Sequence, residues 1–214
     1  NVLSLKPVNI SYEQAAAVPQ AGLLALQGLI DVGHIQHNQK VLINGAGGGA
    51  GTFAIQLAKY FGADVTGVDS TGKLALMRSL GADQVIDYTQ QDFTTNGQQY
   101  DLILDISGTH SIFDVRRSLT SRGRYVMVGG STTLVNQLLF LGPWLSISGR
   151  KKTGLLMHKA NKGLDDLMAL VETGDVVPVI DRRYRLGEAA EAMRYFAAGS
   201  VKGKIVMSVD HGQE

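Results

Sequence analysis

The sequence predicts an α/β fold built on a doubly wound parallel sheet. Between residues 40 and 130, apolar strand-like runs alternate with helical patterns five times, and glycine turns punctuate them. The first unit, "KVLINGAGGGAGTFAIQLAKYFGADVTGVD" at residues 40–69, reads as strand, glycine turn, helix and strand. A helical crossover of this kind makes the two strands parallel.

The elements before and within the first unit follow from helix signals. Residues 11–33 predict a short helix interrupted near Pro19 and a longer helix that ends at Gly33, with Ser11 as the N-cap. The β-branched and Leu run at 41–43 predicts the first strand. The helix after the glycine turn ends at Gly62, which can adopt a left-handed conformation, and residues 64–69 form the second strand.

The next elements repeat the alternation. We expect a short helix at 73–80, closed by Gly81, and three further strands at 84–88, 100–108 and 123–130. A helix at 111–121 lies between the last two of these strands. The run at 100–108 is apolar enough to be buried on both faces of the sheet.

The chain after residue 130 departs from the repeat. Residues 138–159 predict a loop followed by a sixth strand within "KKTGLLMH", and residues 164–175 predict a helix. We expect "DRRYR" at 181–185 to form a surface turn, and residues 187–209 to form a helix and a last strand.

Composition excludes several classes of protein. The chain has 214 residues, 44% of them apolar and 18% charged, which is ordinary for a soluble globular protein. A net charge of +1 gives no electrostatic case for nucleic acid or an anionic membrane. No apolar run approaches 20 residues, and we expect no membrane span. The chain has no cysteine, which fits the reducing cytoplasm.

The glycine turn predicts a dinucleotide site of the Rossmann type. Glycines let the main chain approach a pyrophosphate, whose charge is held by free N–H groups at the helix N-terminus. A glycine string alone is weak evidence, because such turns often bind nothing. The string here lies between a strand and a helix, and Asp69 follows about 20 residues later at a strand end.

The candidate coenzyme-binding residues lie at the carboxyl ends of the predicted strands, where ligands of doubly wound sheets bind. They are Gly45, Ala46, Gly48, Gly49, Gly51, Asp69, Ser70, Lys73, Tyr88, Ser107, Gly108, Gly129 and Gly130. No histidine belongs to a cluster that predicts a metal site: His34 and His37 are three residues apart without a third ligand, and His110 has no neighbouring ligand in the sequence.

Several motifs together resemble one family. They are "EQAAAVPQAGLLALQGL", "VLINGAGGGAG", "SLGADQVIDY", "VMVGG", "PVIDRRYRLGEAAEAM" and "GKIVMSV". In this order they resemble the zinc-independent quinone oxidoreductase (zeta-crystallin-like) branch of the medium-chain dehydrogenase/reductase superfamily. The resemblance implies that a GroES-like catalytic lobe precedes this chain. It divides the chain into a linker at 1–10, a Rossmann domain at 11–174 and a C-terminal segment at 175–214 that returns toward that lobe.

The resemblance also implies the chemistry. Zinc-dependent members carry a cysteine after the proline of "AAAVP", where this chain has Gln20, so we expect no zinc. The expected reaction is hydride transfer from a nicotinamide coenzyme to a quinone or an α,β-unsaturated carbonyl. The catalytic side chains are unknown, and we assign none of them to this chain. Related enzymes pair sheet edges, which favours a homodimer formed through 151–158.

The choice of coenzyme remains open at the level of sequence. Asp69 is the residue type that binds a free ribose 2′-OH and repels a 2′-phosphate, which favours NAD. Lys73 and Tyr88 resemble the lysine and tyrosine that surround the 2′-phosphate in NADPH-dependent quinone oxidoreductases, although Lys73 is equally compatible with a solvated lysine in the first turn of its helix. We favour NADPH because the family branch does.

Two other functions fit the same sequence. One is a non-catalytic module that binds or senses a dinucleotide, since a fold does not fix a function. The other is an alcohol dehydrogenase whose zinc ligands lie in the catalytic lobe.

Overall fold

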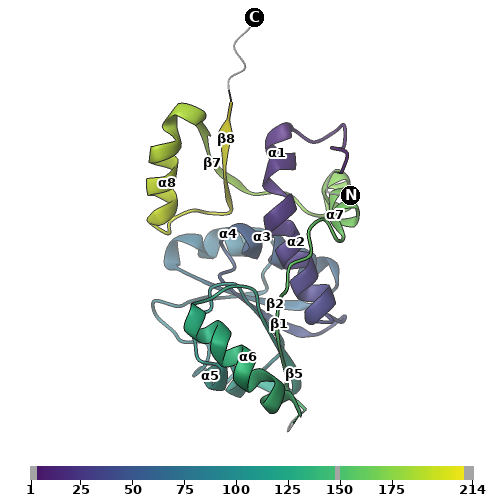
Figure 1. The fold of residues 1–214 in the computed structure, drawn as a ribbon, viewed down its shortest axis with the longest axis vertical. Helices are drawn as coiled ribbons and strands as arrows, with labels where there is room; N and C mark the ends of the chain where they lie inside the picture. The colour runs from purple at the N-terminus through teal and green to yellow at the C-terminus, as the bar shows by residue number, and fades with distance from the viewer. Residues whose placement is uncertain (1–3, 148–149, 210–214) are drawn as a thin grey trace, which may run out of the picture.

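The computed structural model describes residues 4–147 and 150–209, and it confirms the doubly wound parallel sheet. In this part of the chain six parallel strands pair in the order β3-β2-β1-β4-β5-β6. Their bounds are β1 Lys40–Asn44, β2 Asp64–Asp69, β3 Gln84–Asp87, β4 Tyr100–Asp105, β5 Leu119–Met127 and β6 Lys152–Leu155. Figure 1 shows this sheet below the smaller sheet that contains β7 and β8. The order reverses between β1 and β4, and ligands of such sheets bind at this reversal.

The helices match the predicted alternation with one exception, residues 132–147. Their bounds are α1 Tyr12–Ala17, α2 Pro19–Gln27, the π-helical turn η1 Gly28–Val32, α3 Gly49–Tyr60, the 3₁₀ turn η2 Thr71–Lys73, α4 Leu74–Ser79, α5 Ile112–Arg117, α6 Thr132–Ile147, α7 Leu164–Thr173, the 3₁₀ turn η3 Leu186–Glu188 and α8 Ala189–Ala197. Ser11 caps α1 as predicted: its hydroxyl accepts from the Gln14 N–H, and the Gln14 side chain accepts from the Ser11 N–H.

The sheet has a separate apolar core on each face. Val41 and Ile43 of β1 pack into the cluster that includes α2, α3 and α7, whereas Leu42 between them packs into the cluster that includes α5. This alternation is the period of a strand that is buried on both sides. The central strands are therefore packed on both faces, and this packing positions their carboxyl ends.

Residues 132–147 form a helix, so the prediction of a loop at the start of 138–159 was wrong. The sequence of α6 is apolar nearly throughout, and it contains Gly142 and Pro143. Such a segment carries no amphipathic period, and proline inside a helix normally breaks it. The sixth strand, β6, is confirmed; within the described residues it pairs only with β5, so it is an edge strand.

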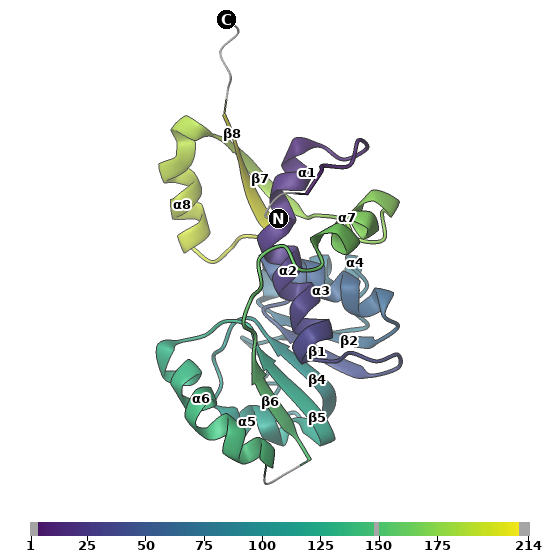
Figure 2. The same ribbon diagram turned by 45° about the vertical axis from the view of Figure 1, so that its right-hand side comes forward.

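Residues 181–185 belong to a strand, so the expected surface turn at "DRRYR" was also wrong. Strand β7, Ile180–Arg185, pairs in parallel with β8, Lys204–Ser208, in a separate two-stranded sheet (Figure 2). The segment is rich in charged residues, which are uncommon in strands, so its sequence does not predict one. Pairing with β8 and burial of Tyr184 stabilise it nevertheless.

Candidate functional site

Two glycines of the turn after β1 are required by the protein's own backbone. Gly45 has a φ of +86°, which favours glycine, and its N–H and that of Ala46 both donate to the Val68 carbonyl at 3.0 Å. A Cβ on Gly51 would lie 2.2 Å from the Gly45 carbonyl oxygen. These two positions therefore fix the turn against β2 and α3, whether or not a ligand binds.

Gly48 is different, because the space beside it is open. A Cβ there would meet only the Gly45 oxygen, at 3.4 Å. Gly48 is the N-cap of α3 and supplies no side-chain hydrogen bond to the helix. Among the described residues nothing accepts from the N–H groups of Gly49 and Ala50. Open space beside free donors at the N-terminus of a twelve-residue helix fits a phosphate group.

Asp69 and Lys73 form an ion pair under the turn. The Lys73 Nζ lies 3.2 Å from Asp69 Oδ1, and both side chains are about nine-tenths buried. Asp69 also accepts from the Gly47 N–H at 2.9 Å and the Ser70 N–H at 2.8 Å. Lys73 is 9% exposed, so its interpretation as a solvated lysine was wrong. Its stem fills the space beside Gly47, where a Cβ would lie 2.7 Å from two of its carbons.

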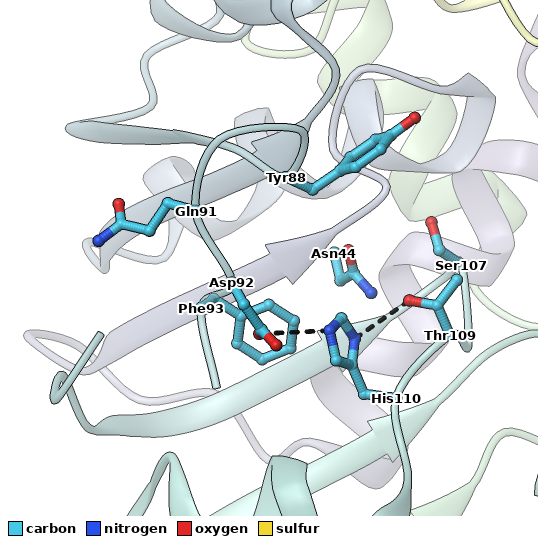
Figure 3. A pocket seen from close by; sticks show the side chains of 8 residues that line it. All are labelled: Asn44, Tyr88, Gln91, Asp92, Phe93, Ser107, Thr109 and His110. Carbon is cyan, nitrogen blue, oxygen red and sulfur yellow. Dashed lines mark hydrogen bonds and ion pairs between the residues drawn. The ribbon is translucent and has the colours of Figure 1, made fainter. Parts of the chain in front are cut away.

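A cavity of about 340 Å³ opens between the loops after β3 and β4 (Figure 3). It combines aromatic and polar side chains: Asn44, Tyr88, Gln91, Asp92, Phe93, Ser107, Thr109 and His110. Tyr88 is 58% exposed at its rim, and its N–H donates to the Asp69 carbonyl. Aromatic walls with a few polar groups are typical of small-molecule sites.

His110 has partners that the sequence analysis missed. Its Nε2 lies 3.3 Å from Asp92 Oδ1, its Nδ1 lies 3.1 Å from the Thr109 hydroxyl, and its ring packs edge-on against Phe93. Partial burial alone would raise the pKa of Asp92, but hydrogen bonds from Thr94 and the nearby His110 hold that pKa below its usual value. The sequence separates Asp92 from His110 by a whole strand, so only the fold reveals the pair.

A buried carboxylate supports the floor of the site. Asp105, at the end of β4, is fully buried and accepts from the Asn44 amide at 2.8 Å, the Gly108 N–H at 2.8 Å and the Tyr125 hydroxyl at 3.0 Å. Burial and the charge of Asp105 raise the pKa of Tyr125 far above its usual value, which keeps the phenol protonated. This network fixes the loop that begins at Ser107.

The loops after β4 and β5 touch one another. Gly108 has a φ of +57°, and a Cβ on it would lie 2.3 Å from the Gly129 oxygen and 2.4 Å from the Cα of Gly130. The Ser107 hydroxyl lies 2.6 Å from where a Cβ of Gly45 would be. The structure thus brings the predicted site residues together along one edge of the sheet.

Lys73 turns toward Asp69 and Gly47, and Tyr88 approaches Asp69 through its backbone, whose N–H donates to the Asp69 carbonyl. The missed lining residues carry a weak sequence signal at best: Asn44 is a polar residue at a strand end, whereas Gln91, Asp92 and Thr109 lie in polar loops.

The described residues do not fit a metal ion. Across 4–147 and 150–209, no group of three or more His, Asp or Glu side chains is placed to hold one. Gln20, at the position where zinc-dependent relatives carry cysteine, is an exposed amide in the first turn of α2. No helix in the same residues is long and apolar enough to cross a membrane.

The doubly wound fold and the residues at the carboxyl ends of its strands define a coenzyme-binding unit. Comparison with known families agrees with this assignment. Residues 80–207 match the family described as zinc-binding dehydrogenase, and the chain belongs to this family within the medium-chain dehydrogenase/reductase superfamily. The resemblance to the medium-chain dehydrogenase/reductase superfamily is thereby confirmed.

Two of the relatives are named as a reductase and an oxidoreductase. The chain is 32% identical to the 2-methylene-furan-3-one reductase of Solanum lycopersicum, over 96% of this chain and 49% of that protein. It is also 32% identical to the chloroplastic NADPH-dependent alkenal/one oxidoreductase of Arabidopsis thaliana, over 96% of this chain and 50% of that protein. The chain spans about half the length of these curated relatives.

A solved structure shows the same architecture. The quinone oxidoreductase from Coxiella burnetii superimposes with a TM-score of 0.86 at 30% identity, over 97% of this chain and 64% of that one.

Proposed function

We propose that this chain is the coenzyme-binding part of an NADPH-dependent reductase that transfers hydride to quinones or α,β-unsaturated carbonyls without zinc. The observation that carries the proposal is the open space at Gly48, beside free N–H groups at the start of α3 and next to the cavity lined by Tyr88 and Ser107. The names of the relatives, which include an NADPH-dependent alkenal/one oxidoreductase, support the reaction class.

In this proposal each part of the edge holds one part of the coenzyme. The pyrophosphate lies at Gly48, Gly49 and Ala50, where the N–H groups offset its charge. The adenosine lies toward the cavity and Tyr88. The loops with Ser107, Gly108, Gly129 and Gly130 lie beside the nicotinamide. When bound, the coenzyme supplies the hydride, and the chain's residues orient it and exclude water.

The ion pair of Asp69 and Lys73 supports NADPH over NADH. A lone carboxylate would repel a 2′-phosphate, but here the Lys73 ammonium offsets that charge at 3.2 Å. Both oxygens of Asp69 already accept hydrogen bonds, from Gly47 and Ser70, and this competes with binding of ribose hydroxyls. Ser70 and Tyr88 lie beside the pair and can donate to a phosphate.

Assembly and division of the chain extend the proposal. Among the described residues β6 is the last strand in the order of the sheet, and this position supports a homodimer in which the sheet continues across a two-fold axis. We retain the linker at 1–10, of which residues 1–3 lie outside the described residues, the coenzyme domain at 11–174 and the segment at 175–214 that contacts the catalytic lobe. The separate β7–β8 sheet supports this last boundary.

Location and partners follow the same reasoning. We propose a cytoplasmic protein from the absence of cysteine, with no nucleic-acid or membrane partner because the net charge is close to zero. The relative from Arabidopsis thaliana is chloroplastic, so imaging of the tagged full-length protein is the test.

Titration separates this proposal from the alternatives. NADPH and NADH are titrated into the chain by calorimetry, and turnover of an enone and a primary alcohol is then measured in the full-length protein after chelation of metals. Binding with enone reduction that survives chelation supports the proposal. Binding without turnover favours a non-catalytic module, and alcohol oxidation lost on chelation favours a zinc alcohol dehydrogenase. Absence of binding to either coenzyme contradicts all three.

A further inference from the structure

The loops after β3 and β4 meet at one wall of the cavity. The His110 Nε2 lies 3.3 Å from Asp92 Oδ1, and the His110 ring packs edge-on against Phe93 with 4.8 Å between the ring centroids. Figure 3 shows these three residues on one side of the cavity and Tyr88 on the other. All four line the cavity, so a ligand bound there can contact the Asp92 carboxylate directly.

The two oxygens of the Asp92 carboxylate have different surroundings. Oδ1 accepts from the Thr94 N–H at 2.7 Å and from the Thr94 hydroxyl at 2.8 Å, and it also faces His110. Across residues 4–147 and 150–209, no hydrogen bond to Oδ2 is present. The side chain is 45% exposed, which leaves this oxygen accessible. An ionised carboxylate only accepts hydrogen bonds, so a ligand that meets Oδ2 has to offer a donor.

His110 holds the carboxylate in this orientation from the other loop. Because the carboxylate cannot donate, the imidazole nitrogen that faces it, Nε2, is the one that carries hydrogen. The Thr109 hydroxyl lies 3.1 Å from Nδ1 and fixes the other side of the ring. The orientation of Asp92 therefore depends on the loop after β4 as well as on its own loop.

We propose that Asp92 is a specificity-determining residue that accepts a hydrogen bond from the exocyclic amine of the coenzyme's adenine, and that His110 is the residue that positions it. This inference rests on the proposed function, which places the adenosine toward this cavity. Adenine carries an amine donor at C6, whereas hypoxanthine carries a carbonyl oxygen at the same carbon. A carboxylate attracts the amine and repels the carbonyl, so the open oxygen of Asp92 would select adenine.

The test compares NADH with reduced nicotinamide hypoxanthine dinucleotide, by calorimetry on the whole chain. We expect the wild type to bind the hypoxanthine dinucleotide about tenfold more weakly, the scale of one hydrogen bond to a charged group. Asp92→Asn should bring the two dissociation constants within about twofold or reverse the preference. The reason is that Thr94 and His110 would hold the amide oxygen, which directs the amide NH₂ group to the cavity.

Two variants test the positioning role. His110→Gln keeps an N–H donor at a similar reach and should retain the preference for adenine, whereas His110→Leu removes the donor and should lose most of it. Asp64→Asn and Lys40→Met are the controls, because they change the charge in opposite directions at the exposed amino ends of β2 and β1. Both controls should retain the preference of the wild type. Thermal unfolding shows whether each variant is folded.

Equal binding of the two dinucleotides by the wild type, or an unchanged preference in Asp92→Asn, would overturn the assignment. An unchanged preference in folded His110→Leu would overturn the positioning role, and if this variant unfolds, His110→Gln decides by keeping or losing the preference. Failure of the wild type to bind either dinucleotide would instead reject the proposed function, so the two failures are distinguishable.

Discussion

Removal of the Lys73 ammonium should change the preference between coenzymes. The substitution Lys73→Met keeps the stem that fills the space beside Gly47 but leaves the Asp69 carboxylate without its counter-ion. The N–H groups of Gly47 and Ser70 still donate to this carboxylate and hold it in place. Its charge then faces the 2′-phosphate without compensation.

The magnitude follows from the burial of the pair. Two unit charges about 6 Å apart interact by about 3 kcal/mol at an effective dielectric constant of 20, and solvent near the ribose lowers this to about 1 to 2 kcal/mol. That range corresponds to NADPH binding about 5- to 30-fold more weakly. NADH lacks the phosphate, so its dissociation constant should change by less than about twofold.

The assay compares both coenzymes by calorimetry in the wild type, Lys73→Met, Asp69→Asn and the control Lys40→Met, at low and at high salt. Asp69→Asn should leave NADPH binding as tight or tighter, because it removes the repulsion while an amide oxygen still accepts from Gly47. The unfolding temperature shows whether each variant is folded. A wild type that prefers NADH tenfold or more, or a Lys73→Met variant that loses both coenzymes equally, would refute the reasoning.

The remaining predictions concern the turn, the sheet edge and acid stability. Gly48→Val should abolish coenzyme binding without unfolding the protein, because the valine side chain would fill the open space that we assign to the pyrophosphate. Unchanged affinity by calorimetry would show that the turn is not part of the coenzyme site. Sedimentation should show a dimer at micromolar concentration, and a monomer would count against pairing through β6. Partial burial alone would raise the pKa of Asp83, but the Lys59 ammonium holds this pKa below its usual value. The lowered pKa stabilises the folded state at pH values above the pKa of Asp83 in the unfolded chain, which is about 4. This stabilisation is lost as the pH falls through the pKa of Asp83 in the folded protein. Asp83→Asn should therefore lower the free energy of unfolding at pH 7 by less than about 1 kcal/mol, and this effect should shrink as the pH falls below about 4, as urea titrations at a series of pH values would show.

The sequence predicted the sheet because its strands are buried on both faces and its turns are marked by glycine. It failed where tertiary contacts decide the local structure: α6 is mostly apolar and contains a proline, and β7 carries charges that are compatible with a strand only because β8 pairs with it. Contacts between side chains of the site could not be predicted from the sequence either. The sequence placed Asp69 and Lys73 at the edge as competitors for the ribose, whereas the fold joins them as one ion pair.

The glycines of the turn show why such a motif is weak evidence by itself. A side chain at Gly45 or Gly51 is excluded by the chain's own backbone and the neighbouring Ser107, and one at Gly47 by the stem of Lys73. A Cβ at Gly49 would only be crowded, by the Lys204 Cδ at 3.1 Å. Protein atoms therefore restrict four of the five glycines between 45 and 51, three of them strictly. Gly48 is left as the position where the protein itself has room for a side chain, so it is the glycine whose replacement separates binding of a ligand from the folding of the turn.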